Sequence, residues 1–244
     1  MKKRYLIPIF ILITFCSKTE EMKITYDEIK NDIVDNKYYC PYERISDIRN
    51  ADYILDKNEL NDFISKQREL YDSNFFVWQD DSIKIDASSY LDAEKYKPSN
   101  VSDNKVETVW AENAKGYGYK EWIKFKVKPS RNYEIQYIAF YPGHGGSIDL
   151  FKKNNRLKSV VVKIYNSSGK GVNDVVGNHV YLFKNFSFSD EAKYHVFSIG
   201  DVYTVGEKNK EQEITVYIEN VYRGSKYDDT CISEISLMGM IWDK

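Results

Sequence analysis

The sequence predicts a mainly β protein, an antiparallel sandwich that follows a small N-terminal helical extension. From residue 82 onward, apolar and polar side chains alternate with a period of two, which is the pattern of strands with one buried face. The chain is also 15% aromatic, with 21 tyrosines, and aromatic side chains are enriched in strands. Turn-forming residues separate the alternating runs, as in a sandwich of many short strands.

The first 15 residues have the composition of a signal peptide. Basic residues at positions 2–4 precede an apolar run at 5–15, which is too short to span a bilayer comfortably. Cys16 follows directly, and the chain then becomes polar. A cysteine at this junction is typical of a bacterial lipoprotein. We therefore predict a signal peptide at 1–15 and lipid attachment at Cys16.

The residues before Cys16 depart from the strict lipoprotein pattern, because the bulky Phe15 occupies a position where a small residue is usual. An ordinary signal peptide or a short uncleaved anchor is the alternative. All these interpretations export the protein, and lipidation would anchor it to a membrane of the bacterial cell envelope.

Charge argues against a nucleic-acid partner. The whole chain has a formal net charge of −2, and removal of 1–15 takes away three basic residues and no acidic ones, which leaves about −5. Such a chain offers no basic face for phosphates.

Residues 16–81 form the predicted helical extension, because they contain two helix-start signals. Each signal is a capping box flanked by apolar residues at the two staple positions. The second is followed by an apolar stripe that we expect to pack on the flank of the sandwich. The capping boxes are Thr25 with Glu28 and Asp56 with Glu59, the predicted helices lie near 26–35 and 57–71, and the stripe is Leu60, Phe63, Ile64, Gln67, Leu70 and Tyr71.

Residues 82–244 form the predicted sandwich. Alternation marks strands near 123–127, 159–164, 179–183, 194–199 and 213–222, with turns near 142–146, 166–169 and 206–212.

Several short motifs in this region occur in the order typical of one family. They are Ala87-Ser88-Ser89, Asp103-Asn104 with Thr108 and Trp110, Glu121-Trp122-Ile123, Asn154-Asn155-Arg156, and the turn and strand at 224–237. Together they resemble the discoidin-like domain, also called the coagulation-factor C-type or galactose-binding-like sandwich. The variant that they resemble most is the NAD glycohydrolase translocation, or NADase-type glycan-binding, domain. The resemblance implies a jelly-roll sandwich whose loops at one end bind a carbohydrate.

One position departs from the family pattern, since Asn104 stands where glycine is usual. Asparagine tolerates a left-handed backbone, so we expect the turn to survive the change.

The resemblance also implies a structural calcium ion at Asp103, Thr108 and Glu234. Calcium binds six to eight oxygen ligands, and a turn backed by two carboxylates suits it. The alternative is that these side chains only satisfy turn amides and one another, so that the protein has no cofactor.

The loops at one end of the predicted sandwich hold the candidate glycan-binding residues. Aromatic rings stack on sugars, and asparagine, arginine and histidine bond to hydroxyls. Trp110 and Trp122 fit the core better, and Asn155 and Arg156 could equally brace a loop. The candidates are Tyr117, Tyr119, His144, Asn154, Asn155, Arg156 and Tyr227.

No catalytic motif is present, so we predict a protein without enzymatic activity. The sequence contains no Gly-x-Ser-x-Gly, His-Glu-x-x-His, phosphate loop or Cys-x-x-Cys, and its three histidines are far apart. Cys231 shares strand parity with Ile235 and Leu237, which favours a core position over a disulfide with Cys40.

The predicted function is therefore that of a non-enzymatic exported lipoprotein whose discoidin-like domain binds a glycan. The alternative is a structural or protein-interaction module at the cell surface that has no sugar pocket.

The lipid anchor predicts the effect of Cys16→Ala. The variant should lose incorporation of radiolabelled palmitate and move out of the detergent phase, because the thiol that would carry the lipid is gone. Undiminished labelling of the variant would contradict the assignment.

Overall fold

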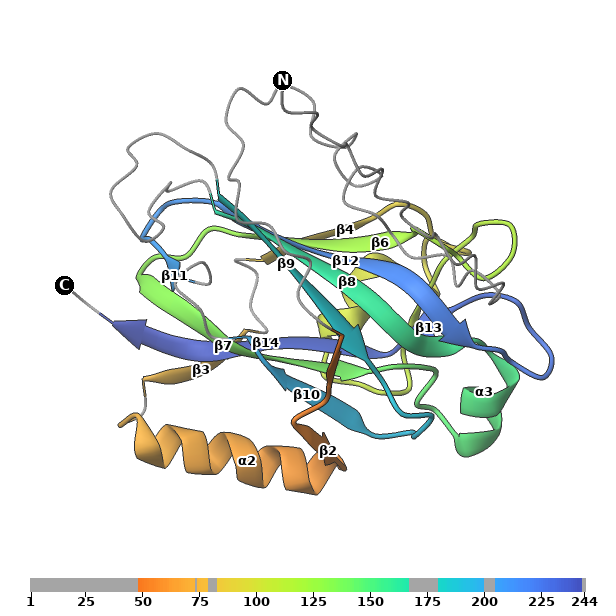
Figure 1. Ribbon diagram of the computed structural model, residues 1–244, viewed down its shortest axis with the longest axis horizontal. Helices are drawn as coiled ribbons and strands as arrows, with labels where there is room; N and C mark the ends of the chain where they lie inside the picture. The colour runs from red at the N-terminus through yellow and green to blue at the C-terminus, as the bar shows by residue number, and fades with distance from the viewer. Residues whose placement is uncertain (1–47, 73, 79–82, 167–179, 200–204, 243–244) are drawn as a thin grey trace, which may run out of the picture.

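The structure is a computed structural model that describes residues 48–242, apart from 73, 79–82, 167–179 and 200–204. Cys16, Cys40, His179 and the helix expected near 26–35 lie outside the described residues. In the described part, two β-sheets stack face to face, and a helix lies on the outside of one of them (Figure 1). The prediction of a mainly β sandwich is confirmed.

The first sheet has six strands in the order β1-β9-β8-β12-β6-β4. All neighbours are antiparallel except β1 and β9, which are parallel. The strands are β1 (Arg49–Asn50), β9 (Val180–Ser187), β8 (Arg156–Asn166), β12 (Gln212–Tyr222), β6 (Trp122–Val127) and β4 (Ile83–Ala87).

The second sheet is antiparallel throughout, with the order β2-β10-β7-β14-β3, and β11 pairs with β7 beside this path. Its strands are β2 (Tyr53–Leu55), β10 (Tyr194–Ser198), β7 (Asn132–Tyr141), β14 (Glu234–Trp242), β3 (Phe75–Trp78) and β11 (Val205–Gly206).

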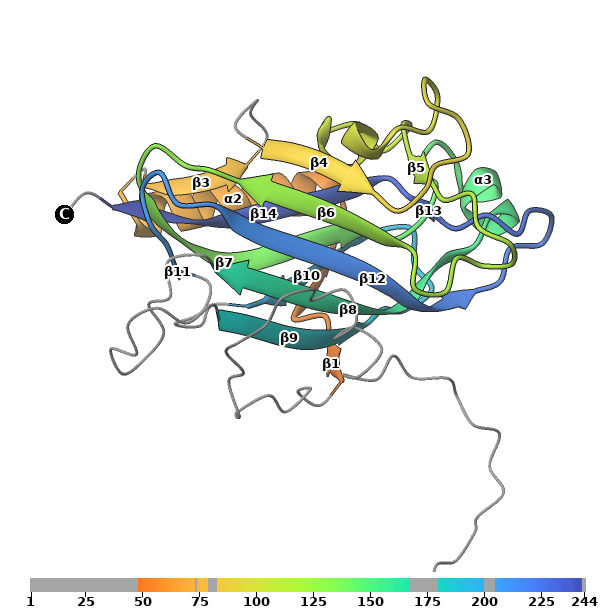
Figure 2. The same ribbon diagram turned by 90° about the horizontal axis from the view of Figure 1, so that it is seen from above.

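Smaller elements gather at one end of the sandwich. Figure 2 shows them at the right-hand end, where β5 pairs with β13 close to the short helix α3. A 3₁₀ helix, η1, contacts β14, β4 and β5. These elements are β5 (Trp110–Ala111), β13 (Cys231–Ile232), α3 (Ile148–Lys153) and η1 (Pro98–Ser102).

The core lies between the two sheets and follows the alternation of the sequence. On β6, every second residue is buried, and Ile123, Phe125 and Val127 are all 0% exposed. Ile138 of β7 and Leu237 of β14 belong to the same core cluster, as does the apolar parity of β12. Residues of one parity from each sheet therefore meet at the centre of the molecule.

Helix α2 (Lys57–Leu70) begins at the predicted capping box. Asp56 Oδ1 accepts the backbone N–H groups of Asn58 and Glu59 at 2.8 and 2.9 Å, and Glu59 Oε2 accepts the N–H of Asp56 at 2.7 Å. The helix covers the outer face of the second sheet (Figure 1), where Leu60 is buried in a second apolar cluster. The expected packing of this helix on the sandwich is thus observed.

Two details of the extension differ from expectation. The segment contributes strands as well as a helix, because β1, β2 and β3 all pair with the sheets. Leu70 does not join the stripe and is 70% exposed. At 3.6 residues per turn it lies about 80° from Leu60 around the helix, whereas Tyr71 lies about 20° away and packs on the cluster.

Neither helix in the described ranges is long and apolar enough to cross a membrane.

The position of Leu60 predicts the contribution of α2 to stability. Leu60→Ala should lower the free energy of unfolding by about 2–4 kcal/mol, since it removes a side chain that is 3% exposed. Leu70→Ala is the matched control and should change it by less than about 0.5 kcal/mol. Urea unfolding measures both, and equal losses would contradict the docking of α2.

Candidate functional site

Four loops meet at the end of the sandwich that carries α3 and β13. The Thr230 hydroxyl donates to the Tyr117 carbonyl at 2.7 Å, and the Asn155 N–H donates to the Asp229 carbonyl at 3.1 Å. Leu91 N–H donates to the Ala111 carbonyl at 2.9 Å. These bonds tie segments that are far apart in the sequence into one surface.

Arg156 holds this end together from inside. Its guanidinium is bidentate on Asp190, at 2.7 and 2.5 Å, and donates to the Arg223 carbonyl at 3.0 Å. It also lies over the rings of Phe151 and Tyr222, at 5.4 and 5.8 Å from their centroids. The residue is only 7% exposed, so Arg156 braces the loops and is not presented to solvent.

The two neighbouring asparagines have the same bracing role. Asn155 is 0% exposed; its amide donates to the Asp228 carbonyl and accepts the Gly224 N–H at 2.7 Å. Asn154 is buried and donates to the Leu150 carbonyl at 2.8 Å. The contacts of Asn155 and Arg156 therefore match the bracing alternative for these two residues.

A buried carboxylate, which the motifs did not identify, supports the same end. Glu112 is 0% exposed and accepts the N–H groups of Thr230 at 2.9 Å and Ala114 at 2.7 Å. Burial raises the pKa of Glu112 to about 7, although both N–H groups act to lower it. Gly118 has φ +73°, and a Cβ there would lie 2.6 Å from the Glu112 carboxyl carbon. The only sequence signal was a glutamate directly after an apolar strand.

Tyr227 and His144 present polar groups at the surface of this end. Tyr227 is 40% exposed, and the ammonium of Lys226 lies 5.0 Å from its ring centroid. His144 is half-buried and accepts the Gly146 N–H at Nδ1, at 3.2 Å, so the neutral ring carries its proton on Nε2. Burial, and secondly the nearby Lys95, lowers the pKa of His144. Lys95 also lies within electrostatic reach of Tyr227.

A second aromatic group lies on the neighbouring loop. The rings of Tyr117 and Tyr119 are 6.2 Å apart, and both side chains are half-buried. The Arg223 guanidinium lies 4.4 Å from the Tyr117 centroid. Among the predicted glycan residues, the four that are partly or largely exposed are therefore Tyr117, Tyr119, His144 and Tyr227.

Trp110 and Cys231 are core residues, as expected. Trp110 is 0% exposed, and its indole N–H donates to the Ser89 carbonyl at 2.8 Å. Cys231 is a free, buried thiol that packs against Val109 and Ala111. Trp122 is half-buried, under the ammonium of Lys124.

Two of the three predicted calcium residues accept the same backbone N–H. The Lys105 N–H donates to Asp103 Oδ1 at 3.0 Å and to Glu234 Oε1 at 2.7 Å, so the two carboxylates lie side by side. The Thr108 hydroxyl donates to Asp103 Oδ2 at 2.7 Å. Asn104 has φ +63°, which confirms the left-handed turn expected of it.

Glu234 lies in a position that disfavours its charge. It is 1% exposed, and burial raises its pKa to about 8; Asp103 adds to this rise, while the Lys105 N–H and Lys57 oppose it. The Lys57 ammonium comes from α2 and donates to the Asn104 amide oxygen.

The chemistry of this carboxylate pair fits a cation, because Glu234 is buried and the half-buried Asp103 lies beside it, so that a positive ion would stabilise the charged form of both. Asp103 and Glu234 would hold the ion, with the Thr108 oxygen nearby, and it would brace the turn against β14. The described residues contain no group of three or more acidic, histidine or cysteine side chains placed to hold a metal.

Ser189 and His195 form a hydrogen-bonded pair outside this site. Ser189 Oγ lies 2.9 Å from His195 Nε2 and 2.8 Å from Glu191 Oε1, and the Lys193 carbonyl lies 3.1 Å from Nδ1. His195 is 0% exposed and packs against Phe188. Ser189 and the Lys193 carbonyl therefore give both ring nitrogens of the buried His195 a hydrogen-bond partner, close to the turn between β9 and β10.

Comparison with protein families gives one assignment. Residues 77–238, more than half of the chain, match the NAD glycohydrolase translocation F5/8 type C domain. The chain belongs to this family. The match agrees with the discoidin-like resemblance of the sequence motifs and with the observed sandwich, and a comparison with curated proteins finds no match.

Solved structures similar to this member of the F5/8 type C family share little sequence with it. The family 32 CBM of NanJ from C. perfringens, in complex with galactose, is 12% identical, with 67% of this chain and 98% of that chain covered and a TM-score of 0.43. An F5/8 type C domain from Bacteroides fragilis is 14% identical, with 68% and 97% covered and a TM-score of 0.45. A C. perfringens CBM32 in complex with GalNAc-β-1,3-galactose is 12% identical, with 66% and 99% covered and a TM-score of 0.42. The family assignment rests on the sequence match.

The two buried glutamates predict how stability depends on pH. Both folded-state pKa values, about 7 for Glu112 and about 8 for Glu234, lie above the usual 4.5. The stability that these two carboxyl groups contribute is fully present below pH 4.5 and is lost as the pH rises to about 8. Each unit of difference between the folded and unfolded pKa corresponds to about 1.4 kcal/mol. In metal-free buffer, the variant Glu234→Gln should lose less stability over this range than the wild type.

Urea unfolding from pH 4.5 to 8.5 measures this difference. His144 and His195 have lowered pKa values and change stability in the opposite direction near pH 6, but both proteins contain them. Identical pH profiles of the wild type and the variant would contradict the position assigned to Glu234.

Proposed function

We propose that this F5/8 type C domain is a non-enzymatic carbohydrate-binding module, exported and anchored by lipid at the cell envelope. The loop end would bind the sugar, with Tyr227, Tyr117 and Tyr119 contacting the ring faces and His144 bonding a hydroxyl. The observation that carries the proposal is Tyr227. It is a 40% exposed aromatic ring at the loop end, and His144 and Lys95 belong to the same surface.

The rigid support under this surface favours a binding role. Arg156, Asn155 and Glu112 are buried, and their polar atoms hold the loops from within. A preorganised surface gains affinity because fewer loop conformations are lost on binding. The amphipathic rings above it suit a ligand with alternating apolar faces and hydroxyls.

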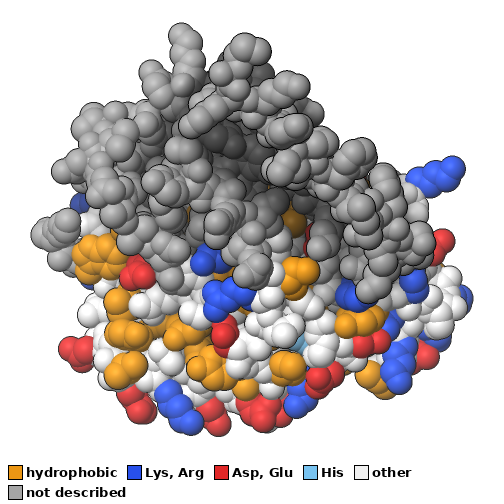
Figure 3. Space-filling model, in the orientation of Figure 1, with side chains coloured by type: hydrophobic (Ala, Val, Ile, Leu, Met, Phe, Trp, Pro, Cys, Tyr) orange, Lys and Arg blue, Asp and Glu red, His pale blue; other side chains and the backbone are white. Residues whose placement is uncertain are grey.

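A protein partner is the second candidate, and a specific observation favours it. Tyr90 and Leu91, on a loop at the same end, are each 42% exposed, and Ile148, which begins α3, is 60% exposed. Exposed apolar side chains of this kind also occur in protein interfaces. Nucleic acid is disfavoured, since acidic and basic side chains are interspersed on the visible described surface (Figure 3).

Substitution of Tyr227 tests the sugar site. The purified protein should bind at least one glycan on an array, and Tyr227→Ala should weaken that binding at least tenfold, about 1.4 kcal/mol, by removing the stacking ring. Tyr53→Ala is the control: this tyrosine is 45% exposed, on β2 beside α2, and its loss should leave affinity unchanged.

Titration calorimetry with the glycan selected on the array measures both variants. The sugar site would be excluded by an array without binding, or by equal affinities of the wild type and Tyr227→Ala. Binding of a protein that Tyr90→Ala and Leu91→Ala abolish would support the second candidate.

We also propose that Asp103 and Glu234 hold a structural calcium ion. The ion would bind the ionised form of Glu234, so added calcium should restore much of the stability that wild type loses between pH 4.5 and 8. At one hundred times its dissociation constant, calcium would add about 2.7 kcal/mol. Glu234→Gln should remove this gain, and a wild type whose unfolding is indifferent to both calcium and chelator would refute the site.

A further inference from the structure

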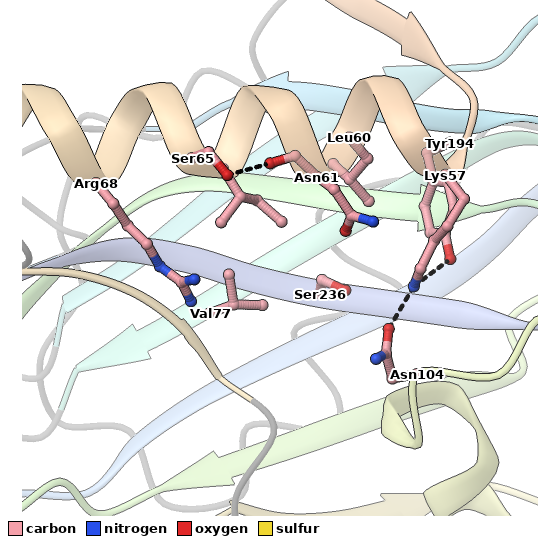
Figure 4. Close-up of a pocket in the computed structure, with 10 residues that line it drawn as sticks. Lys57, Leu60, Asn61, Ser65, Arg68, Val77, Asn104, Tyr194 and Ser236 are labelled. Atoms are coloured by element: carbon pink, nitrogen blue, oxygen red, sulfur yellow. Dashed lines mark hydrogen bonds between the residues drawn. The ribbon is translucent and has the colours of Figure 1, made fainter.

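A groove runs between α2 and the outer face of the second sheet (Figure 4). Its volume is about 320 Å³, at the lower end of the range for small-molecule sites. Leu60, Ile64 and Val77 give it an apolar wall, and amides and hydroxyls complete the lining.

Both charged residues that line the groove are cations. Lys57 lies at one end and Arg68 at the other, eleven residues apart on α2, which corresponds to about 16 Å along the helix axis (Figure 4). Lys57 already bonds to Asn104 and lies close to Glu234. Arg68 makes no hydrogen bond or ion pair with any described residue, and Figure 4 shows its guanidinium turned toward Val77.

The floor of the groove holds an unpaired hydroxyl. Ser236 is 6% exposed, and its side chain has no hydrogen-bond partner among the residues that the structure describes. On β14, Leu237 points into the sandwich core and Met238 belongs to the cluster under α2, so Ser236 shares the face of Met238. Because Ser236 lines the groove, its hydroxyl is available to a hydrogen-bonding ligand there.

We propose that this groove binds a sugar residue that carries a carboxylate. The carboxylate would lie on the unpaired guanidinium of Arg68, which binds planar carboxylates with two parallel hydrogen bonds. Ring hydroxyls would pair with Ser236, Ser65 and Asn61, and the apolar face of the ring would lie along Ile64 and Val77. A neutral sugar would offer Arg68 no carboxylate, and a bare anion would offer no hydroxyl groups to the serine and asparagine side chains.

One wall of the groove lies outside the family match, while Val77, Asn104, Tyr194 and Ser236 lie within it. That match begins at residue 77, whereas α2, which forms one wall, ends at Leu70. Helix α2 therefore does more than cover an apolar face: it adds a cationic, partly polar wall to the second sheet. The site is independent of the proposed glycan site at the loop end.

A panel of sugars tests the proposal on the full chain. D-glucuronate, D-galacturonate and N-acetylneuraminate would be compared with D-glucose and D-galactose by titration calorimetry. We expect at least one sugar acid to bind and the neutral sugars to bind at least tenfold more weakly at the groove. Added salt should weaken the binding of the acid, because it screens the charges. Arg68→Gln should lower affinity for the acid at least tenfold, and Ser236→Ala should lower it severalfold.

Two controls separate this site from other effects. Lys66→Gln removes the same charge from a residue of α2 that does not line the groove, and Tyr227→Ala alters the loop end; both should leave acid binding unchanged. If the free acid and its methyl glycoside bind equally well, the natural ligand is the end of a glycan chain. If the methyl glycoside no longer binds, the natural ligand is a free sugar acid. Absence of Arg68-dependent binding across the panel would overturn the proposal, as would inorganic phosphate that binds as tightly as the best acid.

Discussion

Strand β14 is the element on which the rest of the structure depends, because its two faces serve two different cores. Ile235 and Leu237 point between the sheets, while Met238 packs in the cluster under α2. Glu234, at the start of the same strand, reaches the turn at 103–108 through the Lys105 N–H. A shift of this strand by one residue would exchange all these positions at once, so its pairing with β7 fixes the core, the carboxylate pair and the floor of the groove together.

Much of this arrangement follows from local sequence rules. The capping box at Asp56, the left-handed backbone at Asn104 and the buried parity of β6 were all predictable, since each depends on neighbours in the chain. The exposure of Leu70 was not predictable, because a helical stripe drifts around the axis and the sequence does not show where the covered sheet ends. The strands that residues before 82 add to the sheets were missed for a similar reason, since β1, β2 and β3 are two to four residues long and too short for a clear alternation.

The candidate site was predictable in place but not in detail. Composition indicates which residue types bind sugars, but the same types brace loops, and only tertiary structure separates the two roles. Asn155 and Arg156 have their polar groups engaged by backbone carbonyls, an N–H and Asp190, whereas Tyr227, which lies on the loop that they hold, is exposed. Glu112 was missed because its partners, Thr230 and Ala114, offer backbone N–H groups, which no side-chain motif can reveal.

The loop end and the groove differ in origin, and this difference has a physical consequence. The loop end is built within the segment matched to the family, on buried polar side chains that fix loops of the sandwich itself. The groove requires the docking of α2, whose burial is concentrated at Leu60 and whose N-terminal Lys57 also reaches the turn that carries Asn104. Local opening of α2 would therefore remove one wall of the groove and a cation near Glu234, while the bonds around Arg156 would persist. Ligands at the two places would stabilise different parts of one fold, because a ligand stabilises only the states that contain its complete site.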